Sequence, residues 1–417
     1  MSKKRVVITG MGAITPIGNN LKEYNQSLFN GISGCKPITK FDASKFKTRF
    51  ACELKNYDPL NYFDKKASRK MDAFSQYGLI VAEEALQDSG IDLNKIDKNK
   101  FGVIWGSGVG GIETFQNELI NFSENNKNPR FNPFFIPKLI SDICPGLIAI
   151  KYGLKGPNFA TVSACASASN AIIDSYHYIK SGTADIIITG GSEAAVNETG
   201  IGGFNALKAL SERNDSPETA SRPFDKKRDG FVLGEGGGGL ILENYDHAIK
   251  RNAKIYAEII GFGMSCDAHH ITAPHPDGEG ARLAMNNAIN NANIEKEEID
   301  YINVHGTSTP LGDKSEIFAI ENVFNEHAYN INISSTKSMT GHLLGAAGGI
   351  ESIASIISIN EGFVPPTINH FNNDEEFNPK LNLTLNKTQK RDINIVISNT
   401  FGFGGHNTSI IFKKINL

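Results

Sequence analysis

The stretch TVSACASAS, residues 161–169, places a single thiol, that of Cys165, among small side chains. The amphipathic run NAIIDSYHYIK follows over residues 170–180, and Ser181 and Gly182 then give a stop signal. This pattern predicts a sharp turn into a helix, with Cys165 at or near the first helical turn. Unpaired backbone N–H groups and the positive end of the helix dipole favour a thiolate at that position. Cys165 is therefore a candidate nucleophile; the alternative is a buried structural cysteine, which is what most free cysteines are.

Strand-like apolar runs alternate with helical patterns on both sides of this stretch. Residues 186–188 are all isoleucine, which is typical of a strand buried on both faces. Alternation of this kind predicts an α/β protein with a mostly parallel or mixed sheet. The polar segment 246–252 is followed by a new strand, so we place a boundary near residue 252. The expected halves are residues 1–252 and 253–417.

The composition is typical of a large soluble globular protein. Of the 417 residues, 40% are hydrophobic and 21% charged, which suits about two to three domain-sized cores. The net charge of −3 gives no general basic field, so we expect no nucleic-acid partner. The five cysteines are scattered without a CxxC pair, which favours a reducing compartment, and no zinc-site spacing is present. No uninterrupted apolar stretch reaches the ~20 residues of a membrane span, so we expect a cytoplasmic protein without a membrane partner.

A second cluster, HGTSTPLGD, covers residues 305–313. The apolar run 301–304 reads as a buried strand that ends in His305 and then breaks into glycine, threonine and proline. Catalytic side chains of α/β proteins favour such strand ends, where loops reach the substrate. The alternative is a structural turn whose threonines bond to the backbone.

A third cluster, KSMTGH at residues 337–342, follows the strand-like run 331–334 and opens a helix. Lys337, His342 and Glu351 lie there among small apolar residues. Charged groups in such a setting need partners, because burying them unpaired costs several kcal/mol. We therefore expect a buried polar network; the alternative is a helix-packing motif with a capping histidine.

The fourth cluster, FGFGG at residues 401–405, places three glycines around two phenylalanines. Its exposed backbone N–H groups are of the kind that stabilise a developing oxyanion. A β-bulge in a C-terminal hairpin has the same pattern.

One short segment contains several basic residues, although the net charge of the chain is negative. Lys66, Arg69 and Lys70 share a helix face by their spacing. This is either an ordinary solvated face or a docking surface for an acidic partner.

Two glycine-rich stretches invite comparison with nucleotide-binding loops. The glycines over residues 10–18 lack the spacing of a dinucleotide fingerprint, and those over 234–239 lack the Lys-Ser/Thr of a phosphate loop. A dinucleotide-binding oxidoreductase is therefore only an alternative hypothesis.

Together these motifs resemble the β-ketoacyl-acyl carrier protein synthases, the condensing enzymes of fatty acid synthesis. The resemblance covers essentially the whole chain and is nearest to the type II elongating branch. It rests on VSACAS at 162–167 and on the HGTSTPLGD, KSMTGH and FGFGG clusters, in the family's order and spacing. These motifs contain one cysteine, Cys165, and two histidines, His305 and His342. This set separates the chain from type III synthases, which have asparagine at position 342, and from thiolases, which have a second catalytic cysteine.

The resemblance implies an α/β, thiolase-like fold. Two pseudo-duplicated halves then pack in a five-layer α-β-α-β-α arrangement, and two chains form a homodimer. The implied activity is a decarboxylative Claisen condensation between an acyl chain held on Cys165 and malonyl-acyl carrier protein, giving 3-oxoacyl-acyl carrier protein. The acyl- and malonyl-loaded carrier is the implied partner, and neither a metal nor another cofactor is expected.

The resemblance also implies roles for individual residues. Cys165 is the nucleophile, its N–H and that of Phe403 form the oxyanion hole, and His305 and His342 polarise the malonyl thioester. The residues expected to orient the histidines are Lys337 and Glu351. Those expected to contact substrate are Thr307 and Thr309 at the pantetheine arm, Val109 and the gating Phe403 at the acyl pocket, and Phe204 and Phe231 at the entrance and malonyl sites. Those expected to dock the carrier are Lys66, Arg69, Lys70 and Lys208.

Related activities remain as alternatives within the resemblance. A type I elongating synthase or a polyketide ketosynthase has the same chemistry. A non-catalytic chain-length factor also binds the carrier, but such subunits lack the nucleophile that Cys165 provides.

Overall fold

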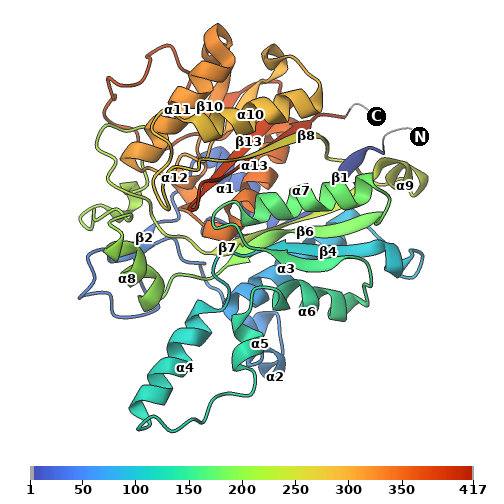
Figure 1. Ribbon diagram of the computed structural model, residues 1–417, viewed down its shortest axis with the longest axis vertical. Coiled ribbons are helices and arrows are strands. Elements are labelled where there is room, and N and C mark those ends of the chain that lie inside the picture. The colour runs from blue at the N-terminus through green and yellow to red at the C-terminus, as the bar shows by residue number, and fades with distance from the viewer. Residues whose placement is uncertain (1–3, 416–417) are drawn as a thin grey trace.

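The computed structural model describes residues 4–415 and contains a mixed ten-stranded sheet. Its strands lie in the order β10-β9-β13-β14-β8-β1-β7-β6-β4-β5 (Figure 1). Five come from the first part of the chain: β1 (Val6–Ile14), β4 (Phe101–Gly106), β5 (Asn158–Thr161), β6 (Ile186–Glu193) and β7 (Gly236–Asn244). The other five follow later: β8 (Ala257–Cys266), β9 (Tyr301–Asn303), β10 (Asn332–Ser334), β13 (Ile395–Gly402) and β14 (His406–Lys413).

The two sets of five strands have the same order and the same directions. β1 is antiparallel to β7, β7 is antiparallel to β6, and β6 runs parallel to β4, which runs parallel to β5. β8, β14, β13, β9 and β10 repeat this pattern. The sets join where residues 6–8 pair with residues 257–259. The expected pseudo-duplication is confirmed, and the boundary at residue 252 stays a prediction.

Helices form three layers around these strands. α3 (Ala73–Ser89) and α6 (Ile143–Tyr152) pack on the first set, and α10 (Glu279–Ala292) packs on β8 and β14 with α11 (Pro310–Phe324) beside it. α7 (Ser167–Lys180) and α13 (Ala347–Glu361) lie between the sets, because α7 contacts β6 and β14 while α13 contacts β13 and β7. Figure 1 shows the resulting α-β-α-β-α order from α10 down to α6. The thiolase-like layering is therefore confirmed.

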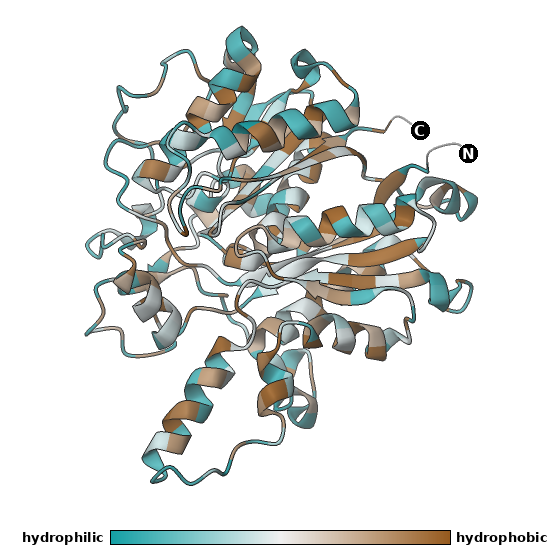
Figure 2. Ribbon diagram, viewed as in Figure 1, coloured by the Kyte–Doolittle hydropathy of each residue, from teal (hydrophilic) through white to brown (hydrophobic). Residues whose placement is uncertain are grey.

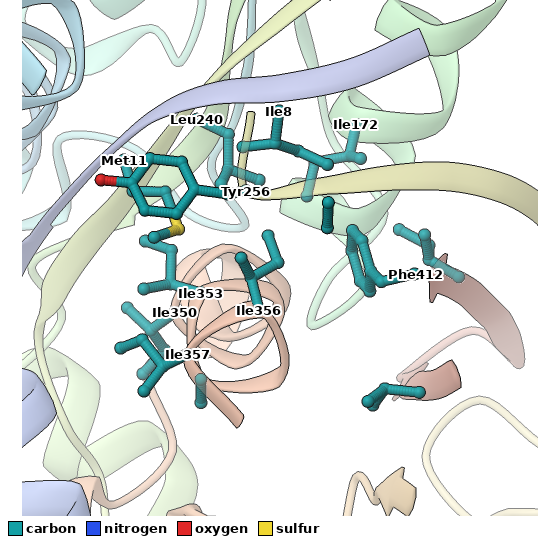
Figure 3. Packing of buried hydrophobic residues seen from close by; sticks show 14 of the residues in the cluster. Ile8, Met11, Ile172, Leu240, Tyr256, Ile350, Ile353, Ile356, Ile357 and Phe412 are labelled. Carbon is teal, nitrogen blue, oxygen red and sulfur yellow. The ribbon is translucent and has the colours of Figure 1, made fainter. Parts of the chain in front are cut away.

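The middle layer explains the apolar character of α13. All its residues from 347 to 359 are buried. Ile350, Ile353, Ile356 and Ile357 pack in one cluster with side chains of β1, α7 and β14 (Figure 3). A helix enclosed on every side has no solvent-facing polar stripe. Glu351, within this buried stretch, therefore needs a partner from another element.

α4 (Ile112–Glu124) and α5 (Phe135–Leu139) project from the body at the bottom of Figure 1. Figure 2 shows apolar residues along α4. Phe115, Leu119, Ile120 and Ile136 are between 40% and 56% exposed. β5 is the last strand of the sheet, so one of its edges has no neighbouring strand among the described residues. Exposed apolar patches and open sheet edges are typical of surfaces that another chain covers.

The remaining elements are short. Apart from short 3₁₀ helices, they are α1 (Leu21–Asn30), α2 (Lys65–Ser68), α8 (Glu198–Ala206), α9 (Tyr245–Lys250), α12 (Lys337–Thr340), and the two-stranded ladders of β2 (Lys36–Pro37) with β3 (Phe50–Ala51) and β11 (Phe363–Val364) with β12 (Gln389–Lys390). Within residues 4–415, every helix is too short or too polar to cross a bilayer.

The helix expected to carry Lys66, Arg69 and Lys70 on one face is interrupted. α2 ends at Ser68, and α3 begins only after Asp72, whose carboxylate accepts the N–H of Phe74. The expected continuous helix is therefore wrong, because α2 ends before Arg69 and Lys70, and the capping Asp72 starts α3 only after the basic segment.

The glycine-rich stretches serve close packing. A side chain on Gly12 in β1 would place its Cβ 2.3 Å from the carbonyl oxygen of Val81 in α3. One on Gly238 in β7 would place it 2.7 Å from the backbone of Gly349 in α13. Glycine at these points lets helices approach the sheet. Gly10 and Gly12 lie inside β1, and the glycines at 236–239 lie inside β7, so these glycines do not form the loop between a strand and a helix that a dinucleotide site requires.

Candidate active site

A tight turn between β5 and α7 presents Cys165. Ala164 has a φ of 50°, in the left-handed region that residues with a Cβ rarely adopt. The Ser167 hydroxyl donates to the carbonyl oxygen of Ala164 and accepts the N–H of Ser163, which holds the turn closed. α7 begins at Ser167 with Ala166 as its N-cap. The predicted position of the cysteine at the start of a helix is confirmed.

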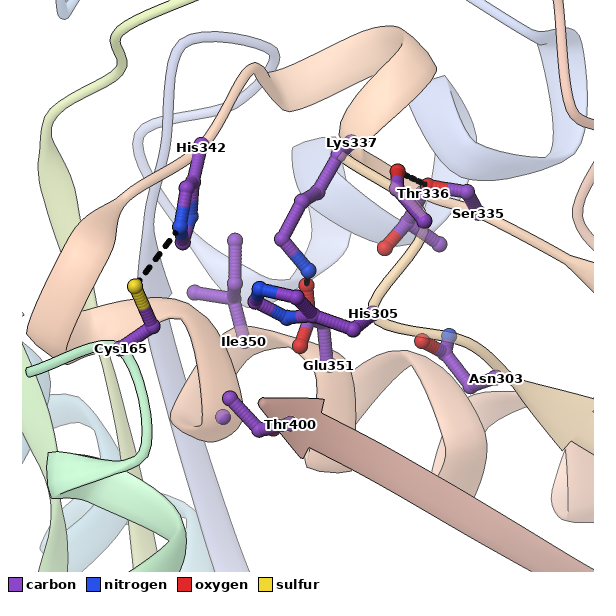
Figure 4. Close-up of polar contacts among 12 residues, drawn as sticks. Cys165, Asn303, His305, Ser335, Thr336, Lys337, His342, Ile350, Glu351 and Thr400 are labelled. Atoms are coloured by element: carbon purple, nitrogen blue, oxygen red, sulfur yellow. Dashed lines mark hydrogen bonds and ion pairs between the residues drawn. The ribbon is translucent and has the colours of Figure 1, made fainter. Parts of the chain in front are cut away.

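Three chain segments bring Cys165, His305 and His342 together (Figure 4). Nε2 of His342 lies 3.0 Å from Sγ of Cys165. The rings of His305 and His342 lie edge to face with centroids 5.1 Å apart. His305 follows β9, where the sequence placed it, and His342 lies between α12 and α13. All three side chains are buried.

Backbone hydrogen bonds fix the segment that carries His342. Its N–H donates to the carbonyl oxygen of Val232 at 2.7 Å, and its carbonyl oxygen accepts the N–H of Gly234 at 2.9 Å. The N–H of Leu344 donates to Nδ1 of the ring at 3.3 Å. This bond assigns the proton of the neutral ring to Nε2. Nε2–H is therefore a donor directed at Sγ of Cys165.

Glu316, on α11, holds the backbone at His305. Its carboxylate oxygens accept the N–H of His305 at 2.9 Å and that of Gly306 at 2.8 Å. Burial raises the pKa of Glu316 to about 7, although the two N–H groups oppose the shift. Nδ1 of His305 is buried and has no hydrogen-bond partner within residues 4–415.

Lys337 on α12 forms an ion pair with Glu351 on α13, and both are buried. Burial raises the pKa of Glu351, and the Lys337 charge opposes that rise. Two members of the expected network are therefore paired. The ring of His342 bonds instead to Cys165 and to the backbone of Leu344.

Burial sets the protonation of the cluster. It raises the pKa of the Cys165 thiol to about 12, although the Lys337 charge and the N–H of Phe403 oppose the rise. Burial, followed by the Lys337 charge, holds the pKa of His305 and that of His342 well below the usual range. At neutral pH the cluster contains a thiol and two neutral rings. This differs from the thiolate predicted from the helix dipole alone, because burial disfavours the charged form.

The FGFGG segment ends β13 and forms the turn to β14. The hairpin of the structural alternative is therefore present, but the pairing of β13 with β14 has no register shift and so no β-bulge. The same turn also brings donors to the thiol. The N–H of Phe403 lies close enough to Cys165 to oppose the rise in the pKa of its thiol. A Cβ on Gly402 would lie 3.1 Å from the backbone nitrogen of Cys165, so this part of the turn covers that N–H group closely. The N–H groups of Cys165 and Phe403 are therefore candidates for an oxyanion hole.

A cavity of about 540 Å³ opens over the cluster. The ring of Phe231 lies 5.3 Å from that of His342 and 5.3 Å from that of Phe204. The hydroxyl oxygens of Thr307 and Thr309 are 3.0 Å apart. The structure brings these predicted contact residues together on the cavity wall: Val109, Phe204, Phe231, Thr307, Thr309 and Phe403.

A second hollow contains most of the expected docking residues. Lys66, Arg69 and Lys70 line it together with Arg130, and Lys70 Nζ lies 5.2 Å from the ring centroid of Phe134. Lys208 does not line this hollow and lies on the wall of the catalytic cavity instead. Sequence reasoning missed Arg130, because the chain brings it back to the basic segment only through the α4–α5 connection.

Glu193 is a second buried carboxylate that sequence reasoning missed. It accepts the N–H groups of Gly108 and Gly345 at 2.7 and 3.0 Å, and also bonds to Ser107 and Val109. It therefore links the loop behind Val109 to the turn after His342. Its position at the end of an apolar strand was the available signal.

Comparisons with known proteins agree along the chain. Residues 3–248 match the family model "Beta-ketoacyl synthase, N-terminal domain", and residues 256–371 match "Beta-ketoacyl synthase, C-terminal domain". The chain is 47% identical over 414 residues to 3-oxoacyl-[acyl-carrier-protein] synthase 2 of Synechocystis, covering 99% of each chain.

Solved structures give the same result. A β-ketoacyl synthase from Burkholderia phymatum is 34% identical with a TM-score of 0.91, covering 99% of this chain and 100% of that one. A type II polyketide ketosynthase in complex with its acyl-carrier protein is 32% identical with a TM-score of 0.90, again over 99% and 100% of the two chains.

Proposed function

The chain belongs to the β-ketoacyl synthase family, and on that premise we propose how its residues elongate fatty acyl chains. The reaction is a decarboxylative Claisen condensation of an acyl chain with malonyl-acyl carrier protein to give 3-oxoacyl-acyl carrier protein. One observation carries the assignment of residues: the thiol of Cys165 meets His305 and His342 at the wall of one cavity.

The first half-reaction is acyl transfer. Sγ of Cys165 attacks the thioester carbon of the acyl-carrier, the carbon–sulfur bond to the carrier breaks, and the thiol proton ends on the carrier's sulfur. The N–H groups of Cys165 and Phe403 stabilise the oxyanion, and each lowers the activation free energy by ~3 kcal/mol. Val109 lines the acyl pocket, Phe403 gates it, and Phe204 and Phe231 line the entrance and the malonyl site. Their positions on the wall support these roles.

The second half-reaction is condensation. Nε2–H of His342 and a ring N–H of His305 donate to the malonyl thioester carbonyl, while Thr307 and Thr309 contact the pantetheine arm. Loss of carbon dioxide leaves an enolate on that carbonyl, and its carbon attacks the acyl group on Cys165. The released thiolate then regains a proton. The low pKa of both histidines supports this role, because neutral rings keep one N–H donor without an added positive charge.

The Lys337–Glu351 pair acts on the histidines as a positioning element. Its ammonium group lies close enough to lower the pKa of both rings. An imidazolium ion would hold the oxyanion more tightly than a neutral ring does. The neutral ring therefore releases the oxyanion more readily at the end of each step.

Acyl carrier protein docks on the basic hollow, with Lys208 at the cavity guiding the pantetheine arm. Five cations line the hollow, those of Lys65, Lys66, Arg69, Lys70 and Arg130, against the single carboxylate of Glu118. This excess of positive charge supports the proposal, since carrier docking requires charge complementarity to an acidic partner. Two chains form a homodimer through the open edge of β5 and the exposed apolar residues of α4 and α5. Sedimentation should therefore give the mass of two chains, and a monomer at micromolar concentration would contradict the dimer.

Mass spectrometry after incubation with acyl-carrier tests the nucleophile. We expect a mass gain of one acyl group on the peptide that contains Cys165. Cys165→Ala should show no gain while keeping its circular dichroism spectrum, and Cys266→Ser, at the one exposed cysteine, should load normally. Normal condensation by Cys165→Ala would overturn the proposal.

A further inference from the structure

We propose that Cys165, His305 and His342 also form a binding site for Zn²⁺, and that its occupation inhibits the free enzyme. A thiolate and two imidazoles are ligands that this ion prefers. The inhibition rests on the proposed function, whereas the binding does not.

The distances suit a zinc site after small movements. Zinc–sulfur distances near ~2.3 Å and zinc–nitrogen distances near ~2.0 Å put the ligand atoms of a tetrahedral site about 3.3–3.7 Å apart. Sγ of Cys165 and Nε2 of His342 are 3.0 Å apart, and ligand atoms of all three residues lie within 4.8 Å of one another. Side-chain shifts of about 1 Å therefore complete the set.

The fourth ligand position faces the cavity. All three residues line that cavity, so water or a small anion has access to an ion held between them. Three protein ligands with an open fourth position are typical of zinc sites that keep an exchangeable ligand.

His305 supplies an independent observation. Its Nδ1 is buried without a hydrogen-bond partner among the described residues. Figure 4 shows its ring directed toward Cys165 and His342. Orphaned buried atoms are uncommon in folded proteins, and an ion is one of the partners that satisfy them.

Two features oppose zinc, and the surroundings offset both. The His342 ring must move its proton from Nε2 to Nδ1 and give up the 3.3 Å bond from Leu344, which is a long hydrogen bond. The Lys337 charge lies nearby, but it is paired with Glu351. The thiol proton passes to solvent on binding, so the zinc-bound thiolate cancels one charge of the ion.

Zinc and the acyl chain compete for the same sulfur. An ion on Sγ blocks attack on the acyl-carrier, and the acyl thioester formed in the first half-reaction no longer offers a thiolate. Zinc therefore binds the free enzyme and not the acyl-enzyme.

Zinc chloride titrated against the full-length protein in the presence of a chromophoric chelator tests the site. We expect one tightly bound ion per chain, with affinity reduced about tenfold or more in Cys165→Ser and in His305→Ala. Protein acylated beforehand should not bind the ion at this site. With cobalt chloride as the probe, the wild type should give thiolate-to-metal absorption in the near-ultraviolet, and Cys165→Ser should not.

The control is the other place where cysteine and histidine gather, at Cys266, His269, His270 and His275. A double Cys266→Ser, His270→Ala variant should bind zinc as the wild type does. Absence of stoichiometric binding, unchanged affinity in folded Cys165→Ser, or loss of binding in the double variant would each overturn the proposal. Because binding is read without substrate, these outcomes are distinguishable from a failure of the condensation chemistry.

Discussion

At the scale of single residues, burial governs the reactivity of Cys165. The turn before α7 gives the thiol a helix dipole and two N–H neighbours, as the sequence indicated. The family resemblance named several residues of the cavity wall, but local patterns did not show that this wall encloses the sulfur, because its residues come from segments far apart in the chain. That wall removes water from the sulfur and raises the pKa of the thiol to about 12. The thiolate is then formed only as the thioester is attacked.

The pH dependence of alkylation tests this view of the thiol. The thiolate is the reactive form, so below its pKa the rate should rise about tenfold per pH unit. We expect the rate of Cys165 alkylation by iodoacetamide, followed by mass spectrometry, to increase throughout pH 7–10. A plateau reached near pH 7 would mean that the helix dipole outweighs burial.

Gly402 is the residue that leaves the oxyanion hole open. In Gly402→Ala the new methyl group would lie about 3 Å from the Cys165 nitrogen, where it crowds that donor. Loss of one donor lowers the rate by about 10²–10³-fold. Quenched-flow measurement of acyl-enzyme formation should show a loss of this size.

Gly146→Ala is the matched control for that substitution. A Cβ on this α6 glycine meets no atom within 4 Å, so acyl-enzyme should form at the wild-type rate. If the Gly402 and Gly146 variants both acylated normally, the assignment of the Cys165 N–H to the oxyanion hole would be wrong.

At the scale of elements, local sequence patterns predicted the strand end and the helix start beside which the candidate catalytic residues lie. His305 after β9 was placed by an apolar run that stops abruptly, and Cys165 before α7 was placed by small residues ahead of an amphipathic run. Glu193 escaped prediction because its acceptor role depends on Gly108 and Gly345, which are 85 and 152 residues away. The continuous helix expected for the basic residues was wrong for a local reason, since α2 ends at Ser68 and Asp72 caps a new helix after them.

The ion pair between α12 and α13 should contribute to stability as well as to catalysis. Glu351→Gln leaves the buried ammonium of Lys337 without its counter-ion, which costs about 3–5 kcal/mol. Urea unfolding should report a loss of this size. The double variant Lys337→Met, Glu351→Leu should regain most of the stability without regaining condensation. If the double variant condensed normally, the pair would have no positioning role.

At the scale of the whole molecule, two pseudo-duplicated halves meet at the cavity. The first half supplies Cys165 and the second supplies both histidines, so neither half is sufficient for the reaction. The presence of Cys165 argues against a non-catalytic chain-length factor. The fold could be predicted because the four motifs carry a family resemblance. The basic hollow could not be predicted in full, since Arg130 joins it only in the folded chain.

Charge reversal in the hollow tests carrier docking. Lys66→Glu with Arg69→Glu replaces attraction to an acidic carrier by repulsion, so KM for acyl-carrier should rise at least about tenfold. The effect should shrink as salt is added, because these charges are exposed. Lys387→Glu, an exposed change outside both hollows, is the control. An unchanged KM in the double variant would refute this docking surface.

A single turnover measures the central claim most directly. Enzyme loaded with an acyl chain on Cys165 is mixed with malonyl-carrier, and both the Cys165 peptide and the carrier are followed by mass spectrometry. The acyl group should leave Cys165 as carbon dioxide is released and a 3-oxoacyl-carrier appears at the same rate, while His305→Ala and His342→Ala keep the acyl group and release no carbon dioxide. Product formation at the wild-type rate in either histidine variant, or without passage through acyl-Cys165, would contradict the account.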